Sequence, residues 1–356
     1  MRLLHVVGTR PNFVKMAPVI AALRARFGAE ENVVVHTGQH YDQAMSDVFL
    51  EELGVGAPDH LLGVGSGSHA VQTARVLERL EVVLRAERPD LVLVPGDVNS
   101  TLAAAVCASR LGMAVAHVES GLRSFDRSMP EEINRIVTDH LAELLFLHSE
   151  EATVNLSAEG VPAARMHFVG NTMIDTLVAL EDRFRGRGTA AALGVEPGGF
   201  LLVTLHRPAL VDGPLLDAAA GALAQVGAEL PVVFPVHPRT RKMLAGAELA
   251  NVQLVDPVGY LDFLSLEADA GAVLTDSGGI QEETTFLGVP CFTLRDNTER
   301  PVTVRAGTNT LLGLDPERIA EIPALLASRD RNPSPQPPPK WDGRAAERIA
   351  DVVAGW

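Results

Sequence analysis

Short apolar runs alternate along this chain with longer stretches in which apolar residues recur at helical spacing. The runs Leu3–Val7 and Leu91–Val94 are each followed by a turn and then by a helical stretch. Runs of this kind suit strands that are buried on both faces, and their alternation with helices predicts parallel sheets built from βαβ units. In the first half we predict strands at 3–7, 33–36, 91–94 and 114–118, and helices at about 14–26, 70–86, 101–110 and 128–145.

The pattern restarts after about Gly170. Strands are predicted there at 201–204, 231–234, 252–255, 273–275 and 291–294. We therefore predict an α/β protein with two Rossmann-like parallel-sheet domains of similar size, at 1–169 and 170–342. A proline-rich connector at 331–340 leads to a stretch with helical spacing at 344–353, which we expect to dock on the protein.

Polar residues gather where the predicted strands end. Ligands of open α/β sheets bind outside the carboxyl ends of the strands. Because both halves supply such residues, the simplest geometry is two sheets that face each other across one cleft. The residues in question are Arg10, His40, Asp97, Glu119, His206, His237, Ser277 and Asp296.

Composition narrows the classes of partner. The chain has 356 residues and a formal net charge of −15, which argues against nucleic acid or an anionic membrane as the main partner. Its two cysteines, Cys107 and Cys291, lie in apolar stretches, so a disulfide framework or a cysteine-rich metal site is not expected. The apolar run after Met1 is too short for a signal peptide, and no run approaches the ~20 residues of a membrane span. We expect a cytoplasmic protein.

The stretch Asp276–Glu283 is the first candidate for ligand binding. A strand there turns through Ser277, Gly278 and Gly279 into a helix, so unobstructed N–H groups and the helix dipole would favour a phosphate. The carboxylates one turn further on would suit ribose hydroxyls, although an ordinary βα turn has the same pattern. Near the first predicted helix, Arg10 and Lys15 would clamp a diphosphate, or Lys15 would be a solvated helix residue.

Three carboxylates are candidates for acid–base chemistry. Asp97 and Glu119 end strands, and Glu131 opens a helix. Their ordinary roles would be helix capping and dipole pairing, but three carboxylates from separate segments that meet in one cleft suit proton transfer. His206 and His237 follow strands in matching positions, which favours contact with a ligand over a purely structural role.

The chain lacks the sequence motifs of several other enzyme classes. The pair His117 and Glu119 has the spacing of a zinc deaminase signature, but no Pro-Cys-x-x-Cys follows. The chain has no Gly-x-Ser-x-Gly elbow and no Walker A loop, and the glycine-rich loop 63–68 departs from the dinucleotide fingerprint.

Taken together, these motifs resemble the UDP-N-acetylglucosamine (UDP-GlcNAc) 2-epimerases of the non-hydrolysing type across nearly the whole chain. Their order and spacing agree throughout, which no single motif would establish. The matching stretches are Gly8–Pro18, Thr37–His40, Gly96–Ala103, His117–Arg123, Pro130–Arg135, Gly170–Asp175, Leu205–Arg207, Asp276–Glu283, Arg295–Pro301 and Ala306–Thr308.

The resemblance implies a GT-B-like fold, with the active site in the cleft between two Rossmann-like domains and the C-terminal helix (343–356) packed back on the first. It also implies a homodimer. The family interconverts UDP-GlcNAc and UDP-ManNAc, its C2 epimer, by eliminating UDP to 2-acetamidoglucal and adding it back. Neither a cofactor nor a catalytic metal is implied, and the partner is the UDP-sugar.

Residue roles follow from the matching positions. The resemblance implies that Asp97, Glu119 and Glu131 are the catalytic carboxylates, without showing which one takes the C2 proton. The other implied residues are Arg10 and Lys15 on the phosphate side, His206 at the diphosphate, Ser277, Gly278 and Gly279 at the phosphates, Glu283 at the ribose, Phe263 at the uracil and Arg300 near the nucleotide.

The chain departs from many bacterial members at three places. Tyr41 and Asp42 stand where those members have Arg-Glu, in a region that forms a second, activating UDP-GlcNAc site in some of them. The segment between Arg123 and Pro130 is shorter and lacks their tryptophan, which leaves open a modified sugar such as a diacetamido uronic acid. Val258 replaces a glutamine that contacts the nucleotide.

Three alternatives remain beside reversible epimerisation. A hydrolysing epimerase, which releases UDP and free ManNAc, shares most of the motifs. A GT-B glycosyltransferase would need no base for C2, so the three carboxylates argue against it. A non-catalytic nucleotide-sugar sensor would bind without turnover.

Overall fold

The computed structural model describes residues 1–38, 49–206, 210, 213, 215–244, 246, 249, 251–329 and 336–356. The chain divides into two compact units, unit 1 with residues 1–178 and 339–356 and unit 2 with residues 179–338. The division falls inside helix α7 (Thr172–Arg185), whereas the sequence places it at Gly170. None of the described helices is long and apolar enough to cross a membrane.

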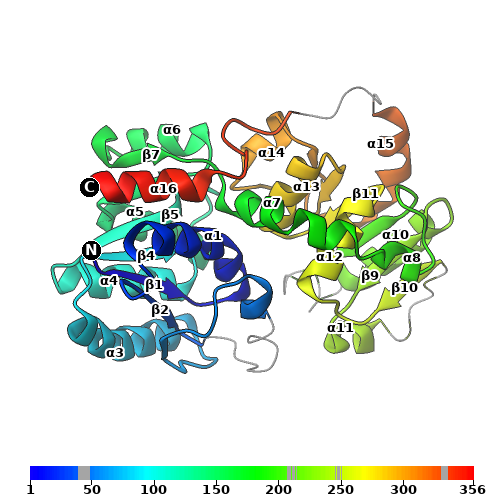
Figure 1. Cartoon of the computed structure of the whole chain (residues 1–356). Coiled ribbons are helices and arrows are strands. Elements are labelled where there is room, and N and C mark those ends of the chain that lie inside the picture. Colours follow the sequence, from blue (N-terminus) through cyan, green and yellow to red (C-terminus); the bar gives the residue numbers. More distant parts are fainter. Residues whose placement is uncertain are drawn as a thin grey trace. The chain divides into compact units, whose positions relative to one another are not determined.

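Unit 1 is built on a parallel sheet of seven strands in the order β3-β2-β1-β4-β5-β6-β7 (Figure 1). The central strands are almost entirely buried, and β4 (Leu91–Pro95) is apolar and buried along its whole length. This is why the apolar runs predicted them correctly. The strands are β1 (Leu3–Val7), β2 (Asn32–His36), β3 (His60–Leu61), β4 (Leu91–Pro95), β5 (Ala114–Ser120), β6 (Leu144–Leu147) and β7 (Met166–Phe168).

Helices cover this sheet through apolar stripes. Val76, Leu80 and Leu84 recur at helical spacing on α3 and pack with Ala104 of α4 and Val92 of the sheet. Helices α3, α4 and α5 pack in succession, and α16 packs against α1 (Figure 1). The bounds are α1 (Arg10–Phe27), α3 (His69–Glu87), α4 (Asn99–Arg110), α5 (Pro130–Leu141), α6 (Glu150–Ala158) and α16 (Ala345–Gly355), with a short 3-10 turn at Ala163–Arg165.

The C-terminal helix α16 is tied to unit 1 by side chains far away in sequence. The carboxylate of Asp175 accepts hydrogen bonds from the backbone N–H groups of Ala345 (3.1 Å) and Ala346 (2.6 Å). These are the helix N–H groups that have no acceptor within the helix. Just before the helix, the buried Trp341 indole donates to the carbonyl of His148 at 2.9 Å.

The helix predicted to run to Leu145 is wrong at its end. Helix α5 stops at Leu141, Ala142 has extended backbone, and 144–147 forms β6 between β5 and β7. A run of apolar residues fits a buried helix and a buried strand equally well until its neighbours are known. The short strands β3, β7 and β13 were not predicted.

Unit 2 has a parallel sheet of six strands in the order β10-β9-β8-β11-β12-β13. Leu201 and Val203 of β8 pack into one apolar cluster and Leu202 into another, so both faces of the sheet are covered. The strands are β8 (Leu201–Thr204), β9 (Val232–Pro235), β10 (Val252–Val255), β11 (Ala272–Thr275), β12 (Cys291–Thr293) and β13 (Asn309–Leu311). The helices are α8 (Thr189–Ala192), α10 (Leu215–Gly227), α11 (Pro238–Met243), α12 (Tyr260–Asp269), α13 (Gly278–Leu287), α14 (Pro301–Arg305) and α15 (Ile322–Ser328), with a 3-10 helix at Pro316–Glu321.

Candidate active site

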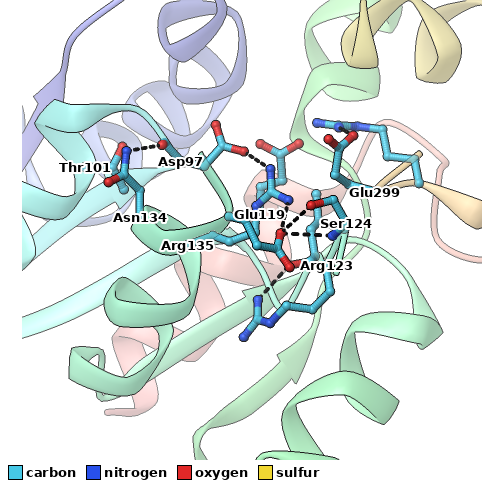
Figure 2. A network of polar contacts seen from close by, with 12 residues as sticks. Asp97, Thr101, Glu119, Arg123, Ser124, Asn134, Arg135 and Glu299 are labelled. Carbon is cyan, nitrogen blue, oxygen red and sulfur yellow. Dashed lines mark hydrogen bonds and ion pairs between the residues drawn. The ribbon is translucent and has the colours of Figure 1, made fainter. Parts of the chain in front are cut away.

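Asp97 lies in the turn that follows β4 and is held from helix α5. Arg135 Nη2 forms an ion pair with Asp97 Oδ2, and Asn134 Nδ2 donates to the Asp97 carbonyl at 2.8 Å (Figure 2). The Asp97 side chain still exposes 26% of its surface, against 4% for Arg135. The carboxylate is therefore fixed in orientation and remains accessible.

Glu119 lies beside this turn, at the end of the neighbouring strand. Its φ of 66° and the register shift between Val118 and Ser120 mark a bulge in β5, a device that redirects a side chain. Glu119 Oε2 forms an ion pair with Lys15 Nζ, and both side chains are nearly buried. A Cβ atom on Gly96 would stand 3.3 Å from Glu119 Oε2 and 3.3 Å from Lys15 Nζ, so the pair packs directly against the turn that carries Asp97.

Lys15 is therefore not a solvated helix residue, and its predicted phosphate contact stays a prediction. It is buried in α1 and neutralises a predicted catalytic carboxylate. Arg10, the first residue of the same helix, is exposed and has no ion pair within the described part of the chain. Its predicted phosphate contact stays a prediction.

Two adjacent glutamates at the start of α5 differ in their surroundings. Glu132 is buried and accepts hydrogen bonds from Ser124 N and Oγ (2.9 Å each) and from Phe125 N (2.9 Å), and it pairs with Arg135 Nη1 (2.7 Å). Glu131 is half-buried and makes no hydrogen bond or ion pair with the residues described. It lies one turn before Arg135 on the helix that holds Asp97, so its carboxylate is the one left available on this helix face.

In unit 2, the turn Ser277-Gly278-Gly279 opens helix α13 directly after β11. Ser277 precedes the helix, and its N–H donates to Thr275 Oγ1 at 3.0 Å, so the anion binding predicted for this turn would rest on the N–H groups of the two glycines. A Cβ atom on Gly278 would lie 2.5 Å from Arg300 Nη1. An added Cβ would therefore displace the Arg300 guanidinium.

Arg300 is buried behind this turn. Its Nε lies 2.9 Å from Glu282 Oε1 and its Nη1 lies 3.4 Å from Glu299 Oε2. Two buried carboxylates thus compensate its charge and hold the guanidinium against Gly278. Its predicted place near the nucleotide stays a prediction.

His206 follows β8, and Asp276 follows the neighbouring strand β11. Asp276 is fully buried, with Oδ2 accepting the His206 backbone N–H at 2.9 Å and Oδ1 lying 2.8 Å from His206 Nδ1. The His206 side chain is 61% exposed, so the carboxylate orients the ring and the remaining ring nitrogen points away from it. Arg207 and His40 lie outside the described residues. His237 follows β9 and is exposed.

Helices α12 and α13 bring buried acids together. Tyr260 Oη donates to Glu283 Oε1 at 3.1 Å. Burial, with a smaller contribution from the negative charge of Glu282, raises the pKa of Glu283 to about 7 against the opposing effect of the Tyr260 hydrogen bond. Glu267 is fully buried, neither carboxylate oxygen has a hydrogen bond among the described atoms, and burial raises its pKa well above the usual value. Phe263, also on α12, is half-buried and packs on the apolar cluster of this face.

The structure thus brings Lys15, Asp97 and Glu119 together and places Glu131 on the helix that holds Asp97. Several supporting residues escaped prediction from sequence: Glu132, Asn134, Arg135 and Asp276. The run Pro130–Arg135 contains three of them, but its pattern indicates only the start of a helix.

Known proteins match this chain over most or all of its length. A family model described as UDP-N-acetylglucosamine 2-epimerase matches residues 22–354. The UDP-N-acetylglucosamine 2-epimerase of Methanococcus maripaludis is 40% identical over 98% of this chain and 97% of that protein. The UDP-2,3-diacetamido-2,3-dideoxy-D-glucuronate 2-epimerase of Pseudomonas aeruginosa is 41% identical over 99% of each chain.

Solved structures agree. The UDP-GlcNAc 2-epimerase of Methanocaldococcus jannaschii, in complex with UDP-GlcNAc and UDP, matches with a TM-score of 0.89 and 40% identity over 100% of both chains. A glycosyltransferase of kitacinnamycin, at 17% identity and a TM-score of 0.59, shares the fold alone. The two parallel sheets are therefore GT-B-like.

Proposed function

The chain belongs to the UDP-N-acetylglucosamine 2-epimerase family, and from this premise we propose that it reversibly inverts C2 of UDP-GlcNAc to give UDP-ManNAc. The observation that carries the proposal is the cluster in unit 1: Glu119 paired with Lys15, packed against the turn that presents Asp97. Such a cluster suits an acid–base reaction at a sugar carbon. A protein that only binds or transfers the sugar has no need of it.

The C2 proton is not acidic, because no carbonyl group is attached to C2. Elimination solves this problem: the C1–O bond breaks, UDP leaves with the electron pair, and a carboxylate takes the C2 proton as the C1–C2 double bond forms. Positive charge that develops on the sugar is stabilised by Asp97, Glu119 and Glu131. A proton returned to the opposite face of C2, followed by re-addition of UDP to C1, gives the epimer.

Unit 2 would hold the nucleotide through both half-reactions. The N–H groups of Gly278 and Gly279 would bind phosphate oxygens, with Ser277 and the buried Arg300 beside them. Glu283 would accept hydrogen bonds from the ribose, and Phe263 would lie at the uracil. His206, oriented by Asp276, would donate a hydrogen bond to the departing diphosphate together with Arg10.

A second substrate has a specific observation in its favour. The diacetamido-glucuronate epimerase of Pseudomonas aeruginosa is as similar to this chain as the archaeal UDP-GlcNAc epimerases are, at 41% identity over 99% of both chains. The same elimination would serve that sugar, since the reaction at C1 and C2 is unchanged. The diacetamido uronic acid sugar differs from that of UDP-GlcNAc only in the groups at C3 and C5.

Solvent exchange at C2 tests the proposal. The protein is incubated in D₂O with UDP-GlcNAc, and in parallel with the diacetamido uronic acid derivative, and both are followed by NMR. We expect deuterium at C2 and a mixture of UDP-linked epimers from one of the two sugars. Accumulating UDP with free ManNAc would instead show a hydrolase. Absence of deuterium from both sugars would refute the epimerase assignment.

We also propose that the protein is a homodimer, as the family resemblance implies. Ile133 and Val137 lie one turn apart on α5 and expose 49% and 37% of their surface, and an exposed apolar stripe of this kind favours a contact with another chain. Light scattering after size exclusion should give twice the monomer mass of 37.9 kDa. A monomer at micromolar concentration would contradict the proposal.

A further inference from the structure

A buried histidine lies directly behind the carboxylates of unit 1. His117 occupies β5, two residues before Glu119, and is fully buried. Its Nδ1 lies 2.7 Å from Asp139 Oδ1, and its Nε2 lies 2.7 Å from the carbonyl oxygen of Gly96. A carbonyl oxygen only accepts hydrogen bonds, so Nε2 must carry a proton.

Asp139 holds the other ring nitrogen. Burial opposes its ionisation, but the neighbouring His117 and Arg123 outweigh burial and hold the pKa of Asp139 below its usual value. The ring is therefore held on both sides, by a carboxylate of α5 and by a carbonyl of the turn after β4.

Asp139 also secures the strand on the far side of Glu119. Its Oδ2 accepts hydrogen bonds from the backbone N–H of Gly121 at 3.1 Å and from Arg123 Nη1 at 2.7 Å. The bulged residue Glu119 thus lies between two anchored positions, His117 and Gly121. This arrangement holds a backbone conformation, φ 66°, that would otherwise be unfavourable for glutamate.

The second bond of His117 reaches the turn of Asp97. Gly96 directly precedes Asp97, and its N–H donates to the Val118 carbonyl at 2.9 Å while its own carbonyl accepts from His117. One ring therefore connects the turn after β4, the end of β5 and helix α5. These three segments carry Asp97, Glu119 and Glu131.

We propose that His117 is a positioning residue for the reaction at C2. Its two hydrogen bonds, to Asp139 and to the Gly96 carbonyl, fix the spacing between Asp97 and Glu119. The proposal rests on the proposed function, because it assumes that these carboxylates act on the sugar. His117 itself touches neither the substrate nor the transferred proton.

Two substitutions separate the two bonds of the ring. In His117→Asn the amide nitrogen replaces Nδ1 and keeps the bond to Asp139, whereas in His117→Gln it replaces Nε2 and keeps the bond to Gly96. We expect kcat to fall by about 10²-fold in His117→Asn and markedly less in His117→Gln, since loss of the Gly96 bond displaces Asp97. KM for the UDP-sugar and the affinity for UDP should change less than about threefold in both variants, because the nucleotide contacts lie in unit 2.

His167→Asn is the matched control. His167 lies in β7 of the same sheet, is half-buried and packs on Phe146 without any contact to the cluster. Its kcat should match that of the wild type. Equal kcat values in His117→Asn and His117→Gln, or a loss of kcat that only follows the folded fraction, would overturn the positioning role.

A measurement without activity keeps the proposal separate from the proposed function. Protein labelled with ¹⁵N-histidine should show one ring, absent from the spectrum of His117→Gln, whose Nε2 carries a proton that exchanges slowly with solvent because it is bonded to the Gly96 carbonyl. An Nε2 without a proton would overturn the proposal even in an active enzyme. Conversely, if the wild type exchanges no C2 proton in either UDP-sugar, the proposed function fails and the hydrogen-bond result still stands or falls by itself.

Discussion

The two units have the same kind of sheet and the same placement of polar residues, yet the acids of their candidate sites have different surroundings. In unit 1, Glu119 is paired with Lys15 and Asp97 with Arg135, so each of these carboxylates has a protein cation beside it. In unit 2, Glu283 and Glu267 are buried on α12 and α13, and the pKa of Glu283 is raised to about 7. Asp97 and Glu119 of unit 1 thus have cationic partners, whereas burial dominates the surroundings of Glu283 and Glu267 in unit 2.

This difference corresponds to two kinds of task. A group that must take or return a proton needs a fixed orientation and an ionisation state set in advance. A group that recognises hydroxyl groups gains its hydrogen bonds only when the ligand arrives. We infer that unit 1 is preorganised for chemistry and that unit 2 is completed by the nucleotide.

The strongest way to break the comparison is to remove a paired carboxylate. Glu119→Gln leaves the buried Lys15 charge uncompensated and takes a carboxylate from the reaction, so kcat should fall by about 10²–10⁴-fold. The affinity for UDP should stay within about threefold, because we propose that most of the nucleotide contacts lie in unit 2. Steady-state kinetics by NMR and calorimetric titration with UDP give the two quantities.

Glu78→Gln is the matched control, since Glu78 is an exposed acid of α3 in the same unit. It should change neither quantity. If Glu119→Gln weakened UDP binding as much as it lowered kcat, the division of tasks between the units would be incorrect.

The next test alters the anion turn of unit 2. In Gly278→Ala the new Cβ would lie 2.5 Å from Arg300 Nη1, and the guanidinium is held there by two buried carboxylates. The resulting displacement should cost about 2 kcal/mol, or roughly thirtyfold in the Kd for UDP. Calorimetric titration measures this directly.

Gly221→Ala provides the comparison within the same unit. Gly221 lies in helix α10, and a Cβ added there meets nothing within 4 Å. The substitution should leave UDP binding unchanged and raise stability by about 0.5–1 kcal/mol, because alanine favours helix. Equal Kd values in both alanine variants would remove the turn from the binding site.

Acidity should weaken binding through Glu283. The groups that face it are Tyr260 and Glu267 on α12 and Glu282 on its own helix, and its raised pKa means that the unliganded protein binds a proton near pH 7. Ribose hydroxyls donate to the ionised form, so binding must release that proton once the pH falls below about 7. Affinity for UDP-GlcNAc should therefore drop about tenfold between pH 8 and pH 6.

Titrations in the Glu119→Gln background avoid turnover, and the diphosphate diester of UDP-GlcNAc does not itself titrate in this range. Adding Glu283→Gln should make the affinity nearly independent of pH. If the affinity still depended on pH after this substitution, the proton would belong to another group. The contrast between the units would then be weaker.

The sequence predicted much of the fold because buried parallel strands are short apolar runs with turn residues at both ends. It failed where this signal is ambiguous, as at 144–147, where the same apolar residues fit a helix or a strand. Strands of two or three residues, such as β3 and β13, carry too little pattern to be recognised.

The candidate site shows the same limit. Strand ends pointed to Asp97, Glu119 and His206, since chain topology alone places such residues at one edge of a sheet. The partners depend on which side chains meet in space, and no periodicity encodes that Arg135 meets Asp97 or that Lys15 meets Glu119. Glu131 and Glu132 are neighbours in the sequence. No local pattern predicts that Glu132 is buried and paired with Arg135 while Glu131 is half-buried.

The smallest effect we predict is on the stability of unit 1, and it tests whether the two units unfold separately. Asp175→Ala removes the acceptor of two N–H groups at the start of α16, both within unit 1, and should cost about 1–2 kcal/mol. For a unit of this size that is a fall of a few degrees in melting temperature, roughly 2–4 °C per kcal/mol. Asp351→Ala, at an exposed position on the same helix, should leave the melting temperature unchanged.

If calorimetry resolves two unfolding transitions, Asp175→Ala should lower the temperature of only one, and UDP added at saturation should raise the temperature of the other. A parallel shift of both transitions would mean that the units unfold as one, and that the contrast between them concerns chemistry and not stability.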